Sequence, residues 1–259
     1  MNQRSGFNWT GWSSFIVVLL LWEIGARLAS GQQVYLPRMT SVIAALAQLA
    51  ISGAVGGHLL ATLERFLTGY LIAAALGITL GIVLGYFQRW HDFLGIVIEL
   101  LRPMPSVAII PVAILSLGIG DSMIVAVTVY ASIWSILINT IDGVRNIEST
   151  LVNTGRTFRL SRRRILWQII LPGAAPYIVT GLRIALSIAL ILVTTAEMIA
   201  ASKGLGFYIL DQERSMNSAN MYAGIIIVAA LGYALNRSFV AVEARALKWR
   251  HGMMARQAI

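Results

Sequence analysis

Charged side chains within long apolar stretches are the residues of this sequence best suited to chemistry. Glu99 and Arg102 are three residues apart, and Pro103 and Pro105 follow directly. At this spacing the two charges share one helix face, so a structural ion pair and a contact on a substrate path are both open interpretations. The prolines remove backbone donors and predict a break in the helix. Because unpaired carbonyls are costly in lipid, that break is expected to face protein or a water-filled cavity.

Arg183 and Glu197 lie in a second apolar stretch. They are fourteen residues apart, nearly four helical turns, so both are expected on one side of a helix at opposite ends. Hydroxyl groups extend this polar face, because Thr180, Ser187 and Thr194 are one heptad apart. Such a face fits a helix that lines a path, and packing in a subunit interface would demand the same residue types.

Residue patterns for enzyme chemistry are missing from the sequence. His58, His91 and His251 are isolated, and no cluster has metal-ligand spacing or pairs a nucleophile with a base. No Gly-rich phosphate loop ending in Gly-Lys-Ser or Gly-Lys-Thr occurs, so the chain is not expected to hydrolyse ATP. There is no cysteine and therefore no disulfide framework. The sequence predicts a non-enzymatic chain without a metal or cofactor of its own.

The composition predicts an all-α integral membrane protein. Of 259 residues, 58% are hydrophobic and 12% are charged, and the net charge of +9 comes in blocks between apolar runs rather than as a nucleic-acid surface. Glu23 and Arg27 within the first run argue against a cleaved signal peptide. Six runs are long enough to cross a bilayer about 30 Å thick, namely 12–29, 66–87, 93–117, 123–141, 174–200 and 221–242.

The distribution of Lys and Arg predicts that both termini are cytoplasmic, because positive charge gathers on the inner side. With this orientation the outer segments hold Arg38, Arg65, Lys203 and Arg214. The inner segments hold Arg4, Arg89, Arg145, the five arginines of 156–164, Arg237, Arg245, Lys248, Arg250 and Arg256.

Two further patterns concern helix packing. Residues 40–51 have apolar side chains at helical spacing but are too few to span, so they predict an amphipathic helix on the outer surface, where packing on the spans and a partner contact are equally open. Gly77, Gly81 and Gly85 lie four residues apart on one face, which favours close helix packing, with a pore-lining role as the alternative.

A basic segment joins the fourth and fifth apolar runs. Ser161 is a suitable N-cap for a short helix over 162–170, and Pro172 is expected to end that helix before the membrane. With a preceding helix over about 151–158, the segment predicts a helix-turn-helix at the membrane surface. Its basic residues are Arg156, Arg159, Arg162, Arg163 and Arg164.

The segment that follows, Leu171–Leu186, resembles the segment after the "EAA" loop in permease subunits of type I ABC importers of the sulfonate, taurine and nitrate group. The residues similar to family signatures are, in order, Leu101-Arg-Pro-Met-Pro-Ser-Val-Ala-Ile-Ile-Pro111, Leu117-Gly-Ile-Gly-Asp121, Asn139-Thr-Ile-Asp-Gly-Val-Arg145, Leu171-Pro-Gly-Ala-Ala-Pro176, Ala196-Glu-Met198 and Gly204-Leu-Gly-Phe207. The resemblance implies a single permease domain over 1–259, with a core at about 60–245 and a coupling loop at 146–172. It also implies six transmembrane helices in the bacterial inner membrane.

The resemblance implies partners as well. They are a second copy of the chain, two ATP-binding cassette subunits that bind ATP and Mg²⁺, an extracytoplasmic binding protein and membrane lipid. It implies transport of a small anion such as a sulfonate, taurine or nitrate, for which Arg102 and Arg183 are suited. The alternatives are a secondary transporter or channel driven by an ion gradient, for which no inverted repeat is visible, and a membrane enzyme, which lacks a site.

The resemblance assigns the ATPase-coupling residues, and the charge, proline and loop patterns suggest the other contacts. The ATPase-coupling residues are Asn153, Gly155, Thr157, Phe158, Arg159, Leu160 and Ser161, and the residues of the path or subunit interface are Glu99, Arg102, Pro103, Pro105, Arg183, Ser187 and Glu197. Lys203, Gly204, Phe207 and Gln212 lie in an outer loop over 202–220 that is expected to touch the binding protein. Asn153-Thr154-Gly155 replaces the family's Glu-Ala-Ala, and Arg159 replaces its glycine. We expect Arg159 to avoid positive φ by a different bend.

Overall fold

The computed structural model describes residues 9–28 and 36–246, and every regular element in these ranges is helical. Arg4, Lys248, Arg250, His251 and Arg256 lie outside the described residues. The longer helices are α1 (Trp9–Leu28), α2 (Met39–Ser52), α3 (Gly56–Tyr86), α4 (Gln88–Leu101), α6 (Asp121–Arg145), α9 (Leu171–Ala200), α10 (Leu205–Arg214) and α11 (Ser218–Ala246). Shorter elements are the 3-10 turn η1 (Ser106–Ile109), α5 (Ile110–Leu117), α7 (Ser149–Thr157), α8 (Arg162–Ile165) and the π turn η2 (Leu166–Ile170).

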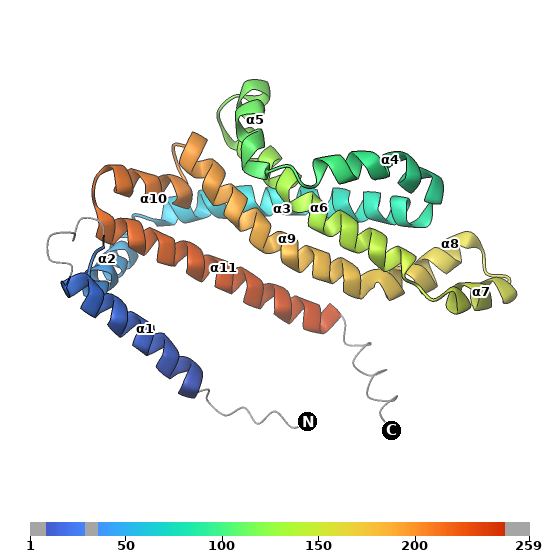
Figure 1. Ribbon diagram of the computed structural model, residues 1–259, viewed down its shortest axis with the longest axis horizontal. Coiled ribbons are helices and arrows are strands. Elements are labelled where there is room, and N and C mark those ends of the chain that lie inside the picture. Colours follow the sequence, from blue (N-terminus) through green and yellow to red (C-terminus); the bar gives the residue numbers. More distant parts are fainter. Residues whose placement is uncertain (1–8, 29–35, 247–259) are drawn as a thin grey trace.

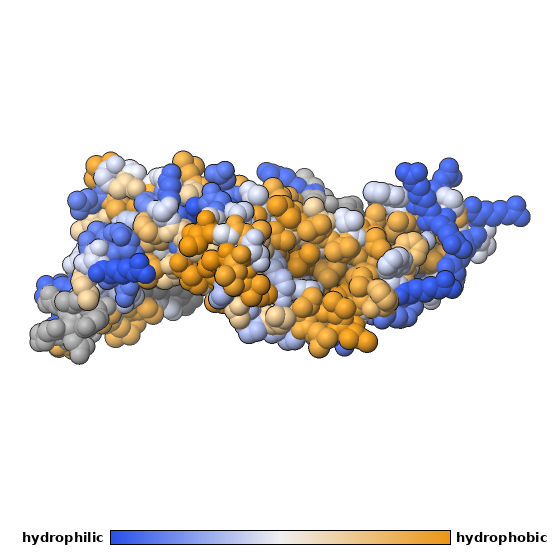
Figure 2. All heavy atoms as spheres, turned by 90° about the horizontal axis from the view of Figure 1, so that it is seen from above, coloured by the Kyte–Doolittle hydropathy of each residue, from blue (hydrophilic) through white to orange (hydrophobic). Residues whose placement is uncertain are grey.

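The long helices α3, α6, α9 and α11 run along the molecule, with α2 and α10 at one end and α7 and α8 at the other (Figure 1). Hydrophobic residues cover the middle of the face in Figure 2, and hydrophilic residues gather at the α7–α8 end. Within the described residues, four helices are long and apolar enough to cross a membrane, or five if the bent pair of α4 with η1–α5 is one span. The prediction of an all-α membrane protein is confirmed.

Glycines allow α3 to lie directly against α6. A Cβ atom at Gly77 would lie 2.9 Å from Cβ of Ile136, and one at Gly81 would lie 2.5 Å from Cβ of Thr140. Gly85 faces Val144 in the same way. The four-residue glycine spacing therefore serves helix packing, as the sequence favoured. On its other side α6 packs along α9, so α3, α6 and α9 form the core.

The predicted break in the third apolar run is confirmed. The axes of α4 and of η1–α5 differ by 90°. Pro105 lies immediately before η1, and Pro111 occupies the first turn of α5, where a missing N–H costs least. The break residues Arg102 and Pro103 are exposed in the single chain, so protein would surround them only if a neighbouring chain covered them.

The short amphipathic helix predicted at 40–51 is α2. Its buried Val42 and Ala45 pack against Ala223 of α11, which supports the packing interpretation. The indole N–H of Trp22 in α1 donates to the carbonyl oxygen of Pro37 at 3.0 Å, which fixes the end of α1 beside α2.

Two sequence predictions of helix boundaries are wrong. Pro172 does not end a helix, because α8, η2 and α9 form one continuous helical unit over Arg162–Ala200. Pro172 lies in the first turn of α9, directly after the wider π turn, which accommodates a residue without an N–H. The predicted outer loop over 202–220 contains the helix α10, which packs on α9 and α11.

Candidate functional site

A hairpin of two short helices forms one end of the molecule. The backbone N–H of Leu160 donates to the carbonyl of Gly155 at 3.0 Å, and that of Arg159 donates to Arg156 at 2.8 Å. This pair of bonds is a Schellman motif, which closes the end of α7. The Ser161 hydroxyl then accepts from the N–H of Arg164 at 3.4 Å, so its predicted role as the N-cap of α8 is confirmed.

The prediction that Arg159 avoids positive φ is wrong. Its φ is 55°, so it occupies the left-handed position that glycine usually takes in a Schellman motif. The two backbone hydrogen bonds and the position of Leu160 near Gly155 offset a cost of about 1 kcal/mol for the non-glycine residue.

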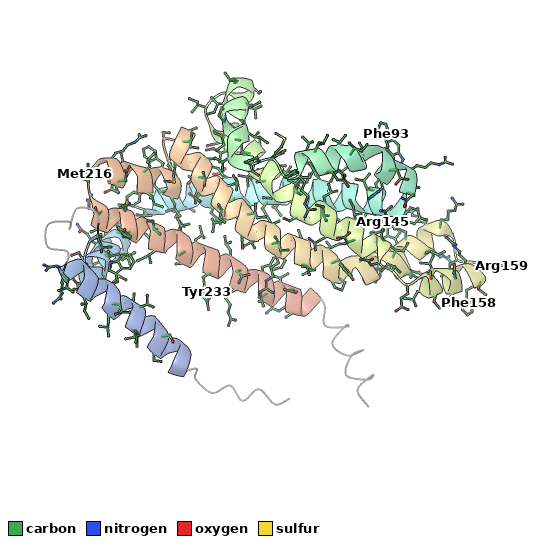
Figure 3. The ribbon with its side chains drawn as sticks, viewed as in Figure 1. Phe93, Arg145, Phe158, Arg159, Met216 and Tyr233 are labelled. Carbon is green, nitrogen blue, oxygen red and sulfur yellow. The ribbon has the colours of Figure 1, made fainter. Side chains whose placement is uncertain are left out.

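The other residues predicted to couple to the ATPase divide between the tip and the interior of this hairpin. Phe158 lies at the tip beside Arg159 and is 77% exposed (Figure 3). Gly155 is buried, and Leu160 is half-buried among apolar side chains where the hairpin meets the spans. Thr157 and Asn153 are exposed, and the Thr157 hydroxyl donates to the carbonyl of Asn153 at 3.0 Å. Phe158 is thus the most exposed large apolar side chain of the hairpin in the described residues.

Glu99, Arg102 and Pro103 line one cavity of about 490 Å³ between α4 and α6. Both charged side chains are exposed, and no ion pair joins Glu99 to Arg102 in the described part of the chain. The interpretation as a structural ion pair is therefore not supported. Pro105 lies just outside this cavity, at the start of η1.

The helix α9 has one open face. Thr180, Ile184, Ser187 and Ile191 are exposed at helical spacing, whereas its opposite side is buried. Arg183, next to this face, lies 3.8 Å from the carboxylate of Glu243 in α11, and its side chain is 50% exposed.

Glu197 lies in a different environment from Arg183, at the far end of α9. Its side chain is fully buried, and Arg65 Nη1 donates to its carboxylate at 2.8 Å. The Thr62 hydroxyl, 2.8 Å from Oε2, and the backbone N–H of Gly206, 3.0 Å away, also donate to this carboxylate. Arg65 Nη2 lies 2.7 Å from the exposed carboxylate of Asp121. We call Thr62, Arg65, Asp121 and Glu197 the outer polar cluster.

The outer polar cluster fixes the connection between α9 and α10. Arg65 donates to the carbonyl of Lys203 at 2.6 Å, and the N–H of Leu205 donates to Thr62 at 2.8 Å. Gly204 has a φ of 133°, and a side chain there would overlap the Glu197 carboxylate. Gly204 is therefore buried and packs directly against the Glu197 side chain.

Helix α10 presents a mixed surface at this end. The ring of Phe207 stacks on that of His58 with centroids 6.1 Å apart, and Gln212 is half-buried. Burial, together with the nearby Asp211, raises the pKa of Tyr208. The exposed charged side chains on and beside α10 are Lys203, Asp211, Glu213 and Arg214.

Sequence reasoning missed Thr62, Arg65 and Asp121 as members of a cluster. Thr62 and Arg65 are three residues apart, so they share one face at the start of α3, and this spacing was the available signal. His58 was interpreted as isolated, although its ring Nδ1 accepts from the N–H of Gly204 at 3.1 Å. No group of His, Cys, Asp and Glu suited to a metal occurs in the described residues.

The described residues form a helical membrane domain with a surface hairpin at one end, a broken span and an open face on a central helix. The family described as "Binding-protein-dependent transport system inner membrane component" matches residues 77–248, and the chain belongs to this family. It is thus a multi-pass inner-membrane permease subunit of an ABC importer. Such a subunit is non-catalytic and has no cofactor, because the partner ATPase binds ATP.

Named relatives cover nearly the whole chain. Taurine transport system permease protein TauC of Escherichia coli K12 is 31% identical over 243 residues, which are 91% of this chain and 87% of that protein. Nitrate import permease protein NrtB of Synechocystis sp. is 30% identical over 236 residues, covering 88% and 85%. An inward-facing structure of the MetNI methionine ABC transporter has the same fold, with a TM-score of 0.63, 18% identity and coverage of 74% and 95%.

Proposed function

We propose that this permease subunit translocates a small anion, such as a sulfonate, taurine or nitrate, that a binding protein delivers. The relatives named for taurine and nitrate support this substrate class. Arg102 and Arg183 are exposed cations, and the one ion-pair partner of Arg183 is 3.8 Å away, so both retain capacity for an anion.

The observation that carries the proposal is the open face of α9. Its exposed side carries the hydroxyls of Thr180 and Ser187 between Ile184 and Ile191, and hydroxyls in a span fit a helix interface or a path better than lipid. A second copy of the chain would supply the facing surface and enclose a path between the two α9 helices. The exposed break at Arg102 and Pro103 would be covered in the same assembly.

The subunit is oriented with both termini in the cytoplasm and has six spans, counting α1 and the bent pair of α4 with η1–α5. The arginine-rich α7–α8 hairpin then lies on the ATPase side, as the excess of inner positive charge requires. The opposite end places α10 toward the binding protein, with Lys203, Phe207 and Gln212 as contact residues. Phe158 and the residues around it enter a groove of the ATPase.

Cysteine cross-linking tests the dimer and the path together. The chain has no native cysteine, so a single Ser187→Cys substitution gives one reporter. We expect Ser187→Cys to form a disulfide between two copies in native membranes, and Tyr233→Cys, which is 68% exposed on α11, to form none. Equal cross-linking at the two positions would refute the dimer through α9.

A transport assay tests the energy source and the substrate. Uptake of labelled taurine, nitrate and an alkyl sulfonate into vesicles is measured with the binding protein present. We expect uptake of one of these anions to stop when the ATPase partner is deleted. Uptake that persists without the ATPase and follows an ion gradient would instead support a secondary transporter.

A further inference from the structure

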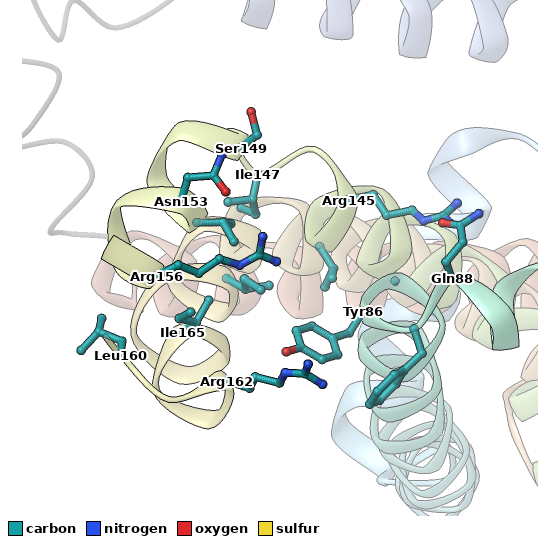
Figure 4. A pocket seen from close by; sticks show the side chains of 15 residues that line it. Tyr86, Gln88, Arg145, Ile147, Ser149, Asn153, Arg156, Leu160, Arg162 and Ile165 are labelled. Atoms are coloured by element: carbon teal, nitrogen blue, oxygen red, sulfur yellow. The ribbon is translucent and has the colours of Figure 1, made fainter. Parts of the chain in front are cut away.

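A cavity of about 800 Å³ separates the end of α3 from the α7–α8 hairpin (Figure 4). Its volume lies in the range of small-molecule sites. Three of its lining residues, Arg145, Arg156 and Arg162, are arginines, and none is Asp or Glu. The cavity therefore concentrates positive charge without an internal counter-charge.

Two of these three arginines have no partner for their charge among the described residues. Arg145 is hydrogen-bonded to Gln88 and to the ring of His91. Arg156 and Arg162 make neither an ion pair nor a side-chain hydrogen bond with any described residue, and Figure 4 shows them extending from α7 and α8 toward Tyr86. Like charges directed into one cavity repel each other, so an anion between them would lower the energy of this arrangement.

One wall of the cavity is apolar, beside polar lining residues that include Gln88, Ser149 and Asn153. Val144, Ile147, Ile165 and Ile170 line it at the ends of the long apolar helices, where α6 leaves and α9 begins the span. Phe87, which also lines the cavity, is 50% exposed, as is typical of aromatic residues at a membrane interface. The site thus combines an anion-binding wall with an apolar wall at interfacial depth.

We propose that this cavity binds the phosphate headgroup of an anionic phospholipid. Arg156 and Arg162 contact the phosphate oxygens, for which the guanidinium fork is well shaped, and Tyr86 offers its hydroxyl. The apolar wall receives the glycerol and the first methylenes of the acyl chains. Basic pockets between membrane helices on the cytoplasmic side suit such headgroups.

The neighbouring arginines provide a matched control. Arg163 and Arg164 follow Arg162 on the same helix and are exposed, but neither lines the cavity. The double variants R156Q/R162Q and R163Q/R164Q therefore remove the same charge from the same hairpin. Only the first removes guanidinium groups that line the cavity.

Native mass spectrometry of the full permease with its ATPase partner tests the proposal. The complex is titrated with phosphatidylglycerol or phosphatidylcholine, and the retained lipid is counted. Each arginine near an anionic surface contributes about fivefold in affinity, so R156Q/R162Q should lower phosphatidylglycerol retention roughly twenty-fold. R163Q/R164Q should retain it as the parent does, and phosphatidylcholine should not be retained.

Three results would overturn the proposal. Equal loss of phosphatidylglycerol in both double variants would mean that general charge, not this cavity, holds the lipid. Displacement of the lipid by millimolar inorganic phosphate would indicate a site for free anions. Release of the ATPase from R156Q/R162Q with lipid retention unchanged would assign these arginines to the ATPase contact. None of these readouts depends on transport, so the proposed function can fail independently.

Discussion

Replacing Glu197 by Gln removes the charge at the centre of the outer polar cluster while keeping the size of the side chain. The amide oxygen of Gln can still accept from Gly206 or Thr62. Its NH₂ group, however, would meet the donors of Arg65 in the place where the carboxylate now accepts at 2.8 Å. The variant therefore leaves a buried guanidinium whose remaining carboxylate partner, Asp121, is exposed.

The magnitude follows from burial. Breaking a buried ion pair by removing one partner costs about 3–5 kcal/mol, because the other charge is left uncompensated. The side chain of Asp121 is 75% exposed, and an exposed ion pair contributes at most about 1 kcal/mol. Both changes remove one carboxylate from Arg65, so Asp121→Asn is the matched control for Glu197→Gln.

Thermal unfolding of the detergent-purified transporter measures the difference. For a chain of this size 1 kcal/mol corresponds to about 2–4 °C, so Glu197→Gln should lower the midpoint by roughly 6–20 °C and Asp121→Asn by no more than about 4 °C. Adding Arg65→Met to Glu197→Gln should recover part of the loss, because both charges are then gone. If Glu197→Gln is as stable as the parent, the carboxyl is held neutral and the ion-pair argument is refuted.

Three further predictions concern packing, the turn and coupling. Gly81→Ala should destabilise the protein by about 1–3 kcal/mol through overlap with α6, whereas Gly95→Ala, with open space around it, should not; equal midpoints would contradict the tight contact. Arg159→Gly should raise the midpoint by relieving about 1 kcal/mol of strain, and a lower midpoint would show that φ is not the dominant effect. Phe158→Ala should uncouple ATP hydrolysis from transport in vesicles more than Arg163→Ala, because apolar contacts outweigh exposed charges; a fully coupled Phe158→Ala transporter would contradict this role.

The helices could be predicted from the sequence because their length and composition are local properties. A membrane span requires about 20 apolar residues, and the described parts of the six runs are helical except at Phe87 and at the break over 102–105. The glycine face of α3 and the break before η1 could be predicted from the sequence in the same way. Spacing of four residues and proline chemistry act within a few residues of the chain.

Arg159 shows where local reasoning failed. The cost of positive φ was estimated correctly in sign, but that reasoning left out the two Schellman hydrogen bonds at the C-terminal end of α7, which offset the cost. Met216 repeats the arrangement after α10, with a φ of 54° and the same pair of bonds, so the fold tolerates a side chain at this position at both ends of the molecule (Figure 3).

The outer polar cluster could not be predicted from the sequence, for a different reason. Thr62 and Glu197 are separated by 135 positions, and only the packing of α3 on α9 brings them together. Glu197 was recognised as a charged residue on a helix in the membrane, and such a residue needs a partner. No pattern in the sequence could choose Arg65 over Arg102 or Arg183 for that partner.

Because Arg162–Ala200 is one continuous helical unit, it connects the surface hairpin directly to the outer polar cluster. Its 39 residues extend about 58 Å at 1.5 Å per residue. One end belongs to the surface hairpin. The other is held by the hydrogen bonds of Glu197 to Thr62 and Arg65 of α3, and Arg65 also pairs with Asp121 at the start of α6. A shift of about 5 Å at α8 would tilt such a rod by roughly 5° about its far end, and α6, which packs along α9, would have to tilt with it. The π turn η2, between the hairpin and the first proline of α9, is the place where such a rod can yield without losing its length.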